Sequence, residues 1–189
     1  DTTASAGHCS RLGTLPTDEL APVIDVIVAA DLGIITLPIT NLYLQGWDAP
    51  VATPRGLTAV RALLDAGARI GAGADNVRDP FNPLGRCDHL ETVSLLVTAA
   101  HVSIDEAYSL ASDGSRSVMR LPEAGAFVGG RAEFVAVKGS SLADVAASAD
   151  PNRVVIHRGA VVSSTVATTT TASWTPIAAT TSTERLVTA

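Results

Sequence analysis

Asp75 is the carboxylate of this sequence that is best placed to do chemistry. It follows a short apolar run at residues 69–73 and precedes a polar loop that contains Pro80 and Pro83. A short apolar run bounded by turn residues is typical of a buried strand. Enzymes with parallel sheets place catalytic groups at the carboxyl ends of such strands, where a carboxylate can bind a metal ion or accept a proton from water. The alternative is a turn or helix-capping aspartate, and the spacing alone does not decide between the two.

His8 and Asn41 follow two earlier predicted strands. His8 comes after the small residues 1–7, and Asn41 comes shortly after the apolar run 34–38. Because parallel strands end on the same side of a sheet, we expect both side chains to share that side with Asp75. An imidazole there could bind a metal ion or hold a reactive hydroxide, although a lone histidine can equally be structural.

Two further groups of residues could contact a substrate. Asn41, Tyr43 and Gln45 alternate along the chain, so an extended segment would point all three to one side. Phe81, in the loop after Asp75, could offer its aromatic face to a flat ring. The alternatives are a polar loop edge for the first group and ordinary turn chemistry for the second.

The first two thirds of the chain alternate predicted strands with predicted helices. Apolar residues at three- and four-residue spacing predict helices, with Thr17 as the N-cap of the first and one apolar stripe formed by Leu20, Val23, Ile24, Ile27 and Val28. The predicted helices cover residues 17–32, 58–66, 88–100 and 104–110. Such alternation implies parallel strands with crossover helices, as in a doubly wound sheet or a (β/α)₈ barrel. Three units are too few to close a barrel.

The pattern changes at residue 127 to that of a small β unit. A strand is expected within residues 129–137, and Arg158-Gly159 lies between two apolar runs, which predicts a hairpin. Residues 166–189 are rich in threonine and alanine, and we expect a poorly ordered tail. The expected division is therefore 1–126, 127–165 and 166–189.

Composition restricts the possible partners. The net charge of -6 gives no electrostatic reason to bind nucleic acid or an anionic membrane. No apolar run is long enough to predict a transmembrane helix. Cys9 and Cys87 make no disulfide framework, so free thiols in the cytoplasm are expected. Because the sequence begins without methionine, we expect a piece of something longer or a processed product.

Three segments resemble the carboxyl-terminal half of cytosine deaminase-like amidohydrolases: TLPITNLYLQG at 36–46, residues 55–85, and VVIHRGAVVSST at 154–165. The resemblance implies the last three β/α units of a (β/α)₈ barrel and the carboxyl-terminal part of a small β-sandwich. It also implies a single divalent metal ion, Zn or Fe, in the complete enzyme, and hydrolytic removal of an amine from a nitrogen heterocycle.

The resemblance also implies roles for individual residues. Asp75 matches a metal ligand and base, and His8 matches the histidine that orients the attacking hydroxide. Asn76 and Phe81 match positions near the substrate ring. Gln45 falls in the LYLQG segment at 42–46, which matches the loop after the seventh strand, and Asn41 directly precedes that segment.

Departures from the family pattern matter as much as the matches. The family's His-x-His pair, another histidine ligand and its acid/base glutamate would all precede residue 1. We therefore expect the chain alone to be inactive and not to retain the metal ion, and we expect the missing amino-terminal half or a self-associated copy as partner. Asn76 stands where cytosine deaminases tend to have a carboxylate, which leaves other amino-substituted heterocycles open. The alternatives are a non-catalytic remnant that acts as an assembly partner, and a hydrolase that releases a bulkier amine.

Overall fold

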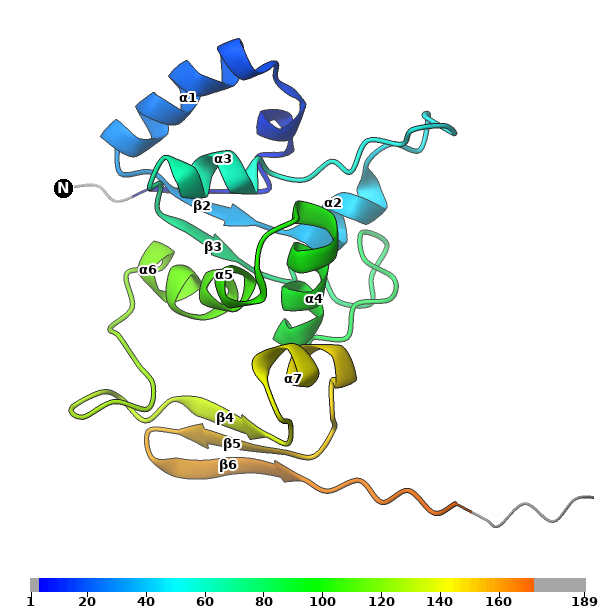
Figure 1. Ribbon diagram of the computed structural model, residues 1–189, viewed down its shortest axis with the longest axis vertical. Helices are drawn as coiled ribbons and strands as arrows, with labels where there is room; N and C mark the ends of the chain where they lie inside the picture. The colour runs from blue at the N-terminus through cyan, green and yellow to red at the C-terminus, as the bar shows by residue number, and fades with distance from the viewer. Residues whose placement is uncertain (1–3, 172–189) are drawn as a thin grey trace, which may run out of the picture.

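Residues 4–171 of the computed structural model form two three-stranded sheets and the helices around them (Figure 1). The first sheet is parallel, in the order β1 (Ser5–Gly7), β2 (Gly33–Thr36) and β3 (Ile70–Ala72). Its register aligns Gly7 with Ile35 and Ile35 with Gly71, so the three strands end at a common edge. Most of the tail expected at 166–189 lies outside the described residues.

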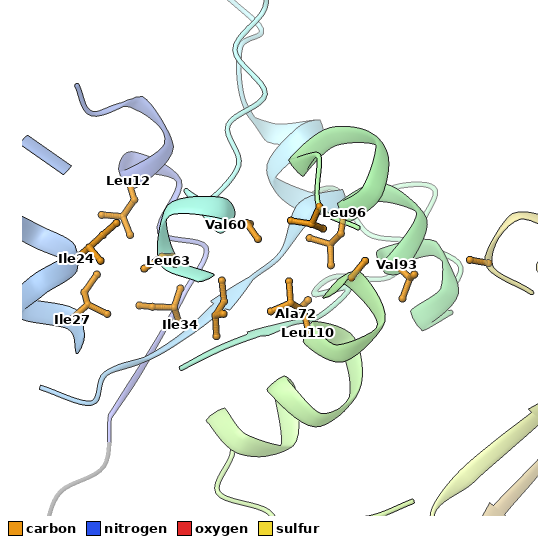
Figure 2. Close-up of a cluster of buried hydrophobic side chains, with 14 residues drawn as sticks. Leu12, Ile24, Ile27, Ile34, Val60, Leu63, Ala72, Val93, Leu96 and Leu110 are labelled. Carbon is orange, nitrogen blue, oxygen red and sulfur yellow. The ribbon is translucent and has the colours of Figure 1, made fainter. Parts of the chain in front are cut away.

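Helices cover this parallel sheet and supply its core. The 3-10 helix η1 (Ser10–Thr14) and α1 (Thr17–Ala29) link β1 to β2, α2 (Pro38–Leu44) and α3 (Val60–Asp65) link β2 to β3, and α4 (His89–Ala100) follows β3. Ile34, Leu63 and Leu96 are at most 1% exposed and lie in one apolar cluster between these elements (Figure 2). The mixed α/β fold that the sequence predicts is therefore confirmed.

Helix α1 buries less than its pattern predicts. Ile24 and Ile27 are buried, but Val23, which belongs to the same predicted stripe, is 38% exposed. The helix lies at the outer side of the parallel unit in Figure 1, and Ile24 and Ile27 are its only buried residues. Thr17 is the first helical residue and not the N-cap, because Pro16 occupies that position with extended backbone and no side-chain cap.

The segment after β2 is helical and not extended. Pro38 stands at the first turn of α2, where its fixed φ favours a helix and its missing N–H costs nothing. The alternation expected for Asn41, Tyr43 and Gln45 therefore does not hold. Asn41 is 2% exposed, whereas Tyr43 is 38% exposed and packs edge-on against Trp47.

A long helical run follows α4. It consists of α5 (Ile104–Ser109), a π-helical turn η2 (Leu110–Gly114) and α6 (Ser115–Val118), and it extends well beyond the predicted helix at 104–110. Ser103 begins it with a capping box, in which Ser103 and Glu106 exchange side chain-to-backbone hydrogen bonds. The run packs against β3 on the side away from α3 (Figure 1).

The second sheet is antiparallel, in the order β4 (Phe134–Val137), β5 (Arg153–His157) and β6 (Ala160–Thr165). The hairpin predicted at Arg158-Gly159 joins β5 to β6. Helix α7 (Leu142–Ser148) joins β4 to β5 and packs against α4 and α5. No helix within residues 4–171 is long and apolar enough to cross a membrane.

Candidate functional site

Two strand ends of the parallel sheet carry the residues of the candidate site. His8 directly follows β1 and Asp75 follows β3, and both have left-handed backbone, with φ of 64° and 63°. This conformation costs a residue with a side chain about 1–2 kcal/mol. The His8 backbone is held by two hydrogen bonds, from its N–H to the Ile35 carbonyl at 3.0 Å and from the Thr58 hydroxyl to its own carbonyl.

The structure brings His8, Asn41 and Asp75 together. His8 Nε2 lies 3.5 Å from Asp75 Oδ2, and His8 Nδ1 lies 2.7 Å from Asn41 Oδ1. The His8 and Asp75 side chains are 45% and 27% exposed, so solvent reaches both of them. Asn41, which hydrogen-bonds to the ring nitrogen of His8 that does not face Asp75, is 2% exposed.

Two threonines that no sequence pattern marks as site residues support this arrangement. Thr58 is 4% exposed and donates its hydroxyl hydrogen to the His8 carbonyl. Thr40 is 1% exposed and donates to the Ala74 carbonyl at 3.4 Å, one residue before Asp75. Neither residue had a recognisable signal, because a threonine at the start of a predicted helix or in a loop is common.

The loop after β3 is organised by Asp79. Its carboxylate accepts hydrogen bonds from the Asn76 side chain, from the Phe81 N–H at 2.9 Å and from the Asn82 N–H at 3.0 Å. Desolvation raises the pKa of Asp79, but these donors outweigh it and hold the pKa below its usual value. The loop therefore has a defined shape and presents Phe81 to solvent with 54% of its surface exposed.

Gln45 lies apart from these contacts. It is exposed at the end of α2 and lies over Gly56, where an added Cβ would come within 2.1 Å of Gln45 Cγ. The predicted substrate-binding residues thus fall into separate surroundings: Asn41 beside His8, Asn76 and Phe81 around Asp79, and Gln45 over Gly56.

Comparisons with known proteins identify the family. Residues 2–166 match the family model described as "Amidohydrolase family". The chain belongs to the amidohydrolase family. This finding confirms the resemblance that segments 36–46, 55–85 and 154–165 show to this family.

One relative is a pterin deaminase from Rhizobium rhizogenes (strain K84), which is 31% identical over 163 residues. The match covers 84% of this amidohydrolase chain and 37% of the relative, so the chain spans well under half of that protein's length.

Two solved structures share the fold. One is 5-methylcytosine deaminase from Klebsiella pneumoniae liganded with phosphonocytosine, with a TM-score of 0.77 and 19% identity, covering 89% of this chain and 42% of that one. The other is N-isopropylammelide isopropylaminohydrolase from Burkholderia multivorans, with a TM-score of 0.70 and 23% identity, covering 85% and 39%.

Deaminases of the amidohydrolase family are generally metal-dependent, so the donor atoms of the site bear on metal binding. Two ligands of a tetrahedral zinc ion are about 3.4 Å apart, which resembles the 3.5 Å between His8 Nε2 and Asp75 Oδ2. However, within residues 4–171 no three His, Cys, Asp or Glu side chains come together to hold a metal ion. The described residues therefore supply donors of suitable chemistry but do not complete a metal site.

A hollow of this amidohydrolase lies elsewhere, between α6 and the loop before β4. It has a volume of about 1010 Å³, and Arg116, Arg120 and Glu133 are among its lining residues. Three of its charged groups already have partners: Arg116 donates to the Pro122 carbonyl, Arg120 pairs with Asp31, and Glu133 accepts from His157.

Cys9 follows His8 in the sequence, but its surroundings indicate a structural role and not a chemical one. It packs partly buried against the apolar core, and burial raises the pKa of its thiol. Because the thiolate is the reactive form, this environment disfavours a nucleophilic role.

Proposed function

We propose that this chain forms part of the active site of an amidohydrolase that deaminates an amino-substituted nitrogen heterocycle by hydrolysis. The observation that carries the proposal is the approach of His8 to Asp75 from the ends of two strands that are not neighbours. The names of the relatives, a pterin deaminase and a 5-methylcytosine deaminase, support this class of substrate.

The proposal includes an architecture larger than the described residues. Residues 1–126 would supply the last three units of a (β/α)₈ barrel, and residues 127–165 the carboxyl-terminal part of a β-sandwich. The chain spans 37% of the pterin deaminase and 42% of the 5-methylcytosine deaminase, so the other strands would come from polypeptide outside this chain. Its free thiols support a cytoplasmic setting.

In this proposal Asp75 and His8 act on the attacking water. Asp75 accepts its proton, and His8 holds the water beside the ring carbon that carries the amine. The water oxygen bonds to that carbon, the proton taken up by Asp75 is returned to the amine nitrogen, the carbon–nitrogen bond breaks, and the nitrogen leaves as ammonia. Asp75 would also be one ligand of a divalent ion, Zn or Fe, whose other ligands lie outside the described residues; such an ion makes water more acidic.

Substrate contacts are assigned to the surroundings of these two residues. Phe81 offers an exposed aromatic face to a flat ring, and Asn76 lies one residue beyond Asp75. Asn41 and Gln45 were expected to bind substrate as well. Gln45 keeps an exposed amide at the end of α2, whereas the buried position of Asn41 favours a different role.

The proposal can be tested by measuring ammonia release from pterin, cytosine and 5-methylcytosine. We expect none from the 189-residue chain with added Zn or Fe, and activity above that background would contradict the expected dependence on other strands. A fusion to the amino-terminal portion of the Rhizobium rhizogenes pterin deaminase is expected to gain activity. Asp75→Asn and His8→Asn should each lower it about 10²- to 10⁴-fold, while Asp65→Asn, at an exposed carboxylate, should not.

If the folded, metal-loaded fusion releases no ammonia, or if Asp75→Asn leaves its activity unchanged, the deaminase proposal is wrong. A fusion that releases isopropylamine from N-isopropylammelide instead would indicate a hydrolase for bulkier amines.

A non-catalytic assembly role is the second candidate, and exposed apolar side chains favour it. Val135 and Val155 are register partners on one face of the antiparallel sheet, and they are 49% and 36% exposed. Such a face can bury area against another chain. Light scattering distinguishes the two cases: a stable dimer with no activity in any fusion would favour assembly, and a sharply melting monomer would contradict it.

A further inference from the structure

The buried amide of Asn41 contacts one ring nitrogen of His8, and the other ring nitrogen faces Asp75. Asn41 is 2% exposed, and its Oδ1 lies 2.7 Å from His8 Nδ1, which is a short, direct hydrogen bond. Its backbone is also held, because its N–H donates to the Leu37 carbonyl at 3.0 Å and its carbonyl accepts from the Gln45 N–H at 3.1 Å. The amide therefore has little freedom to move away from His8.

The chemistry of the amide oxygen fixes the proton. A carbonyl oxygen can only accept a hydrogen bond, so the His8 nitrogen that faces it must be the donor. A neutral imidazole has one N–H, which is then on Nδ1 and leaves the lone pair on Nε2. Nε2 is the atom that lies 3.5 Å from Asp75 Oδ2, a distance longer than a normal N–H···O hydrogen bond.

Asn41 does not have the surroundings of a substrate contact. Asn41 is 2% exposed, whereas the side chain of His8, its hydrogen-bond partner, is 45% exposed. Asn41 Nδ2 is buried and has no hydrogen-bond partner among residues 4–171. An unpaired buried N–H costs about 1–3 kcal/mol, and leucine has a similar shape without this cost, so stability alone does not explain an amide at this position.

We propose that Asn41 is a positioning residue: its amide oxygen keeps the His8 proton on Nδ1 and directs the Nε2 lone pair toward the space beside Asp75. The proposal rests on the proposed function for its catalytic meaning, but the tautomer itself is a property of the folded chain. The orientation of His8 follows from the same contact, because a rotated ring would lose its hydrogen bond to a buried acceptor.

The test is a long-range ¹H–¹⁵N spectrum of the 189-residue chain labelled with ¹⁵N-histidine, recorded at about pH 8.5 without metal or substrate. We expect His8 to show the pattern of a ring that is protonated on Nδ1. The chain has four histidines, and the signals of His89, His101 and His157 serve as internal references. A wild-type His8 that carries its proton on Nε2 overturns the proposal without any variant.

Variants isolate the contribution of the amide oxygen. Asn41→Leu keeps the approximate shape and removes the acceptor, so the His8 pattern should move toward that of an unconstrained histidine. Asn41→Asp keeps an acceptor oxygen and should keep the pattern. Leu44→Ala, at a 40% exposed position of the same helix, is the control and should change nothing. An unchanged His8 pattern in a folded Asn41→Leu chain also overturns the proposal.

Activity provides a separate measurement. In an active fusion, Asn41→Leu should lower kcat about 10- to 100-fold with little change in KM, because residues that orient a catalytic group have effects of this size. A confirmed tautomer in a chain whose fusions never release ammonia would contradict the proposed deaminase function and leave the assignment of the proton intact. If His8 carries its proton on Nε2 and the fusion is active, only the role of Asn41 is contradicted.

Discussion

Ser115 hydrogen-bonds to both polar groups of the Ala72 peptide backbone at the outer edge of β3. Its hydroxyl oxygen accepts from the Ala72 N–H at 3.1 Å, and it lies 2.7 Å from the Ala72 carbonyl and 2.9 Å from that of Leu110, to either of which it can donate. Residues on either side of Ala72 bond to β2, as in the hydrogen bond from the Gly73 N–H to the Thr36 carbonyl. The helical run therefore satisfies both polar groups of Ala72 at this edge of the sheet.

Replacing Ser115 with alanine should destabilise the protein by about 1–3 kcal/mol. The substitution leaves the buried N–H and carbonyl of Ala72 without this partner, and unpaired buried groups have that cost. Urea unfolding measures the effect. Ser117→Ala, two residues further along at an exposed position, is the control and should stay within about 0.5 kcal/mol. Equal midpoints for the two variants would show that Ser115 is not needed at this edge.

Gly71 allows the helical run to approach β3 so closely. A Cβ at this position would lie 2.7 Å from Ser115 Cα and 2.8 Å from its backbone nitrogen, neither of which can move without shifting α6. Gly71→Ala should therefore destabilise the fold by about 1–3 kcal/mol. Gly7→Ala is a matched control in the same sheet, because its Cβ would meet only the end of the Leu37 side chain at 3.5 Å. Similar melting temperatures for the two variants would contradict this account.

Asp88 joins the start of α4 to the antiparallel sheet and should make stability depend on pH. It pairs with Arg153 of β5 at 2.9 Å and caps α4 by accepting from the Leu90 N–H. Desolvation raises the pKa of Asp88, but the Arg153 side chain and the Leu90 N–H outweigh it and hold the pKa below its usual value. A carboxyl whose pKa is lower in the folded state stabilises the fold above its unfolded pKa of about 3.9. This contribution is lost as the pH falls through the lower folded value.

We therefore expect Asp88→Asn to reduce stability at pH 7 and to flatten the loss of stability below about pH 4. Asparagine can still cap a helix, so this variant removes the ion pair and keeps the cap, whereas Asp88→Ala removes both and should cost about 1 kcal/mol more. Arg153→Met tests the pair from the other side. The measurement is the free energy of unfolding from pH 2 to pH 7. The same loss of stability at low pH in Asp88→Asn and in wild type would contradict this role of the ion pair.

Asp79 should control the rigidity of the loop that follows Asp75. Asp79→Ala removes the acceptor for the Asn76 side chain and for two backbone N–H groups, so the loop should open more often. Arg78 is exposed within this loop, and limited trypsin digestion should cut it several-fold faster in the variant. Asp48→Ala, in an exposed loop elsewhere, is the control. Unchanged cleavage at Arg78 would show that other contacts hold the loop.

The sequence predicts the strand–helix order well because apolar periodicity is a local signal. β2, β3 and α4 fall within or close to their predicted ranges, and the polar residues after β1 and β3 lie together as parallel strands require. The resemblance to amidohydrolases carried the assignment of the family, which periodicity alone could not provide.

What the sequence does not predict depends on contacts between distant residues or on short helices. α2 was expected to be extended, because seven residues that begin with Pro38 make too short a helix to show a period. α7 begins after Ser141, a serine N-cap followed by Ala-rich sequence that was not recognised. The hydrogen bond between His8 and Asn41 joins residues 33 positions apart, and only the helical turn of α2 makes it possible.

The length of the connection between β2 and α2 determines whether the Asn41 amide points toward His8. Strands β1 and β3 lie two strand spacings apart, roughly 10 Å, so His8 and Asp75 meet by reaching across the end of β2. Each residue turns an α-helix by about 100°, so inserting or deleting a single residue between Thr36 and Asn41 would rotate the amide away from His8. This short connection should therefore tolerate changes in side-chain type better than changes in length.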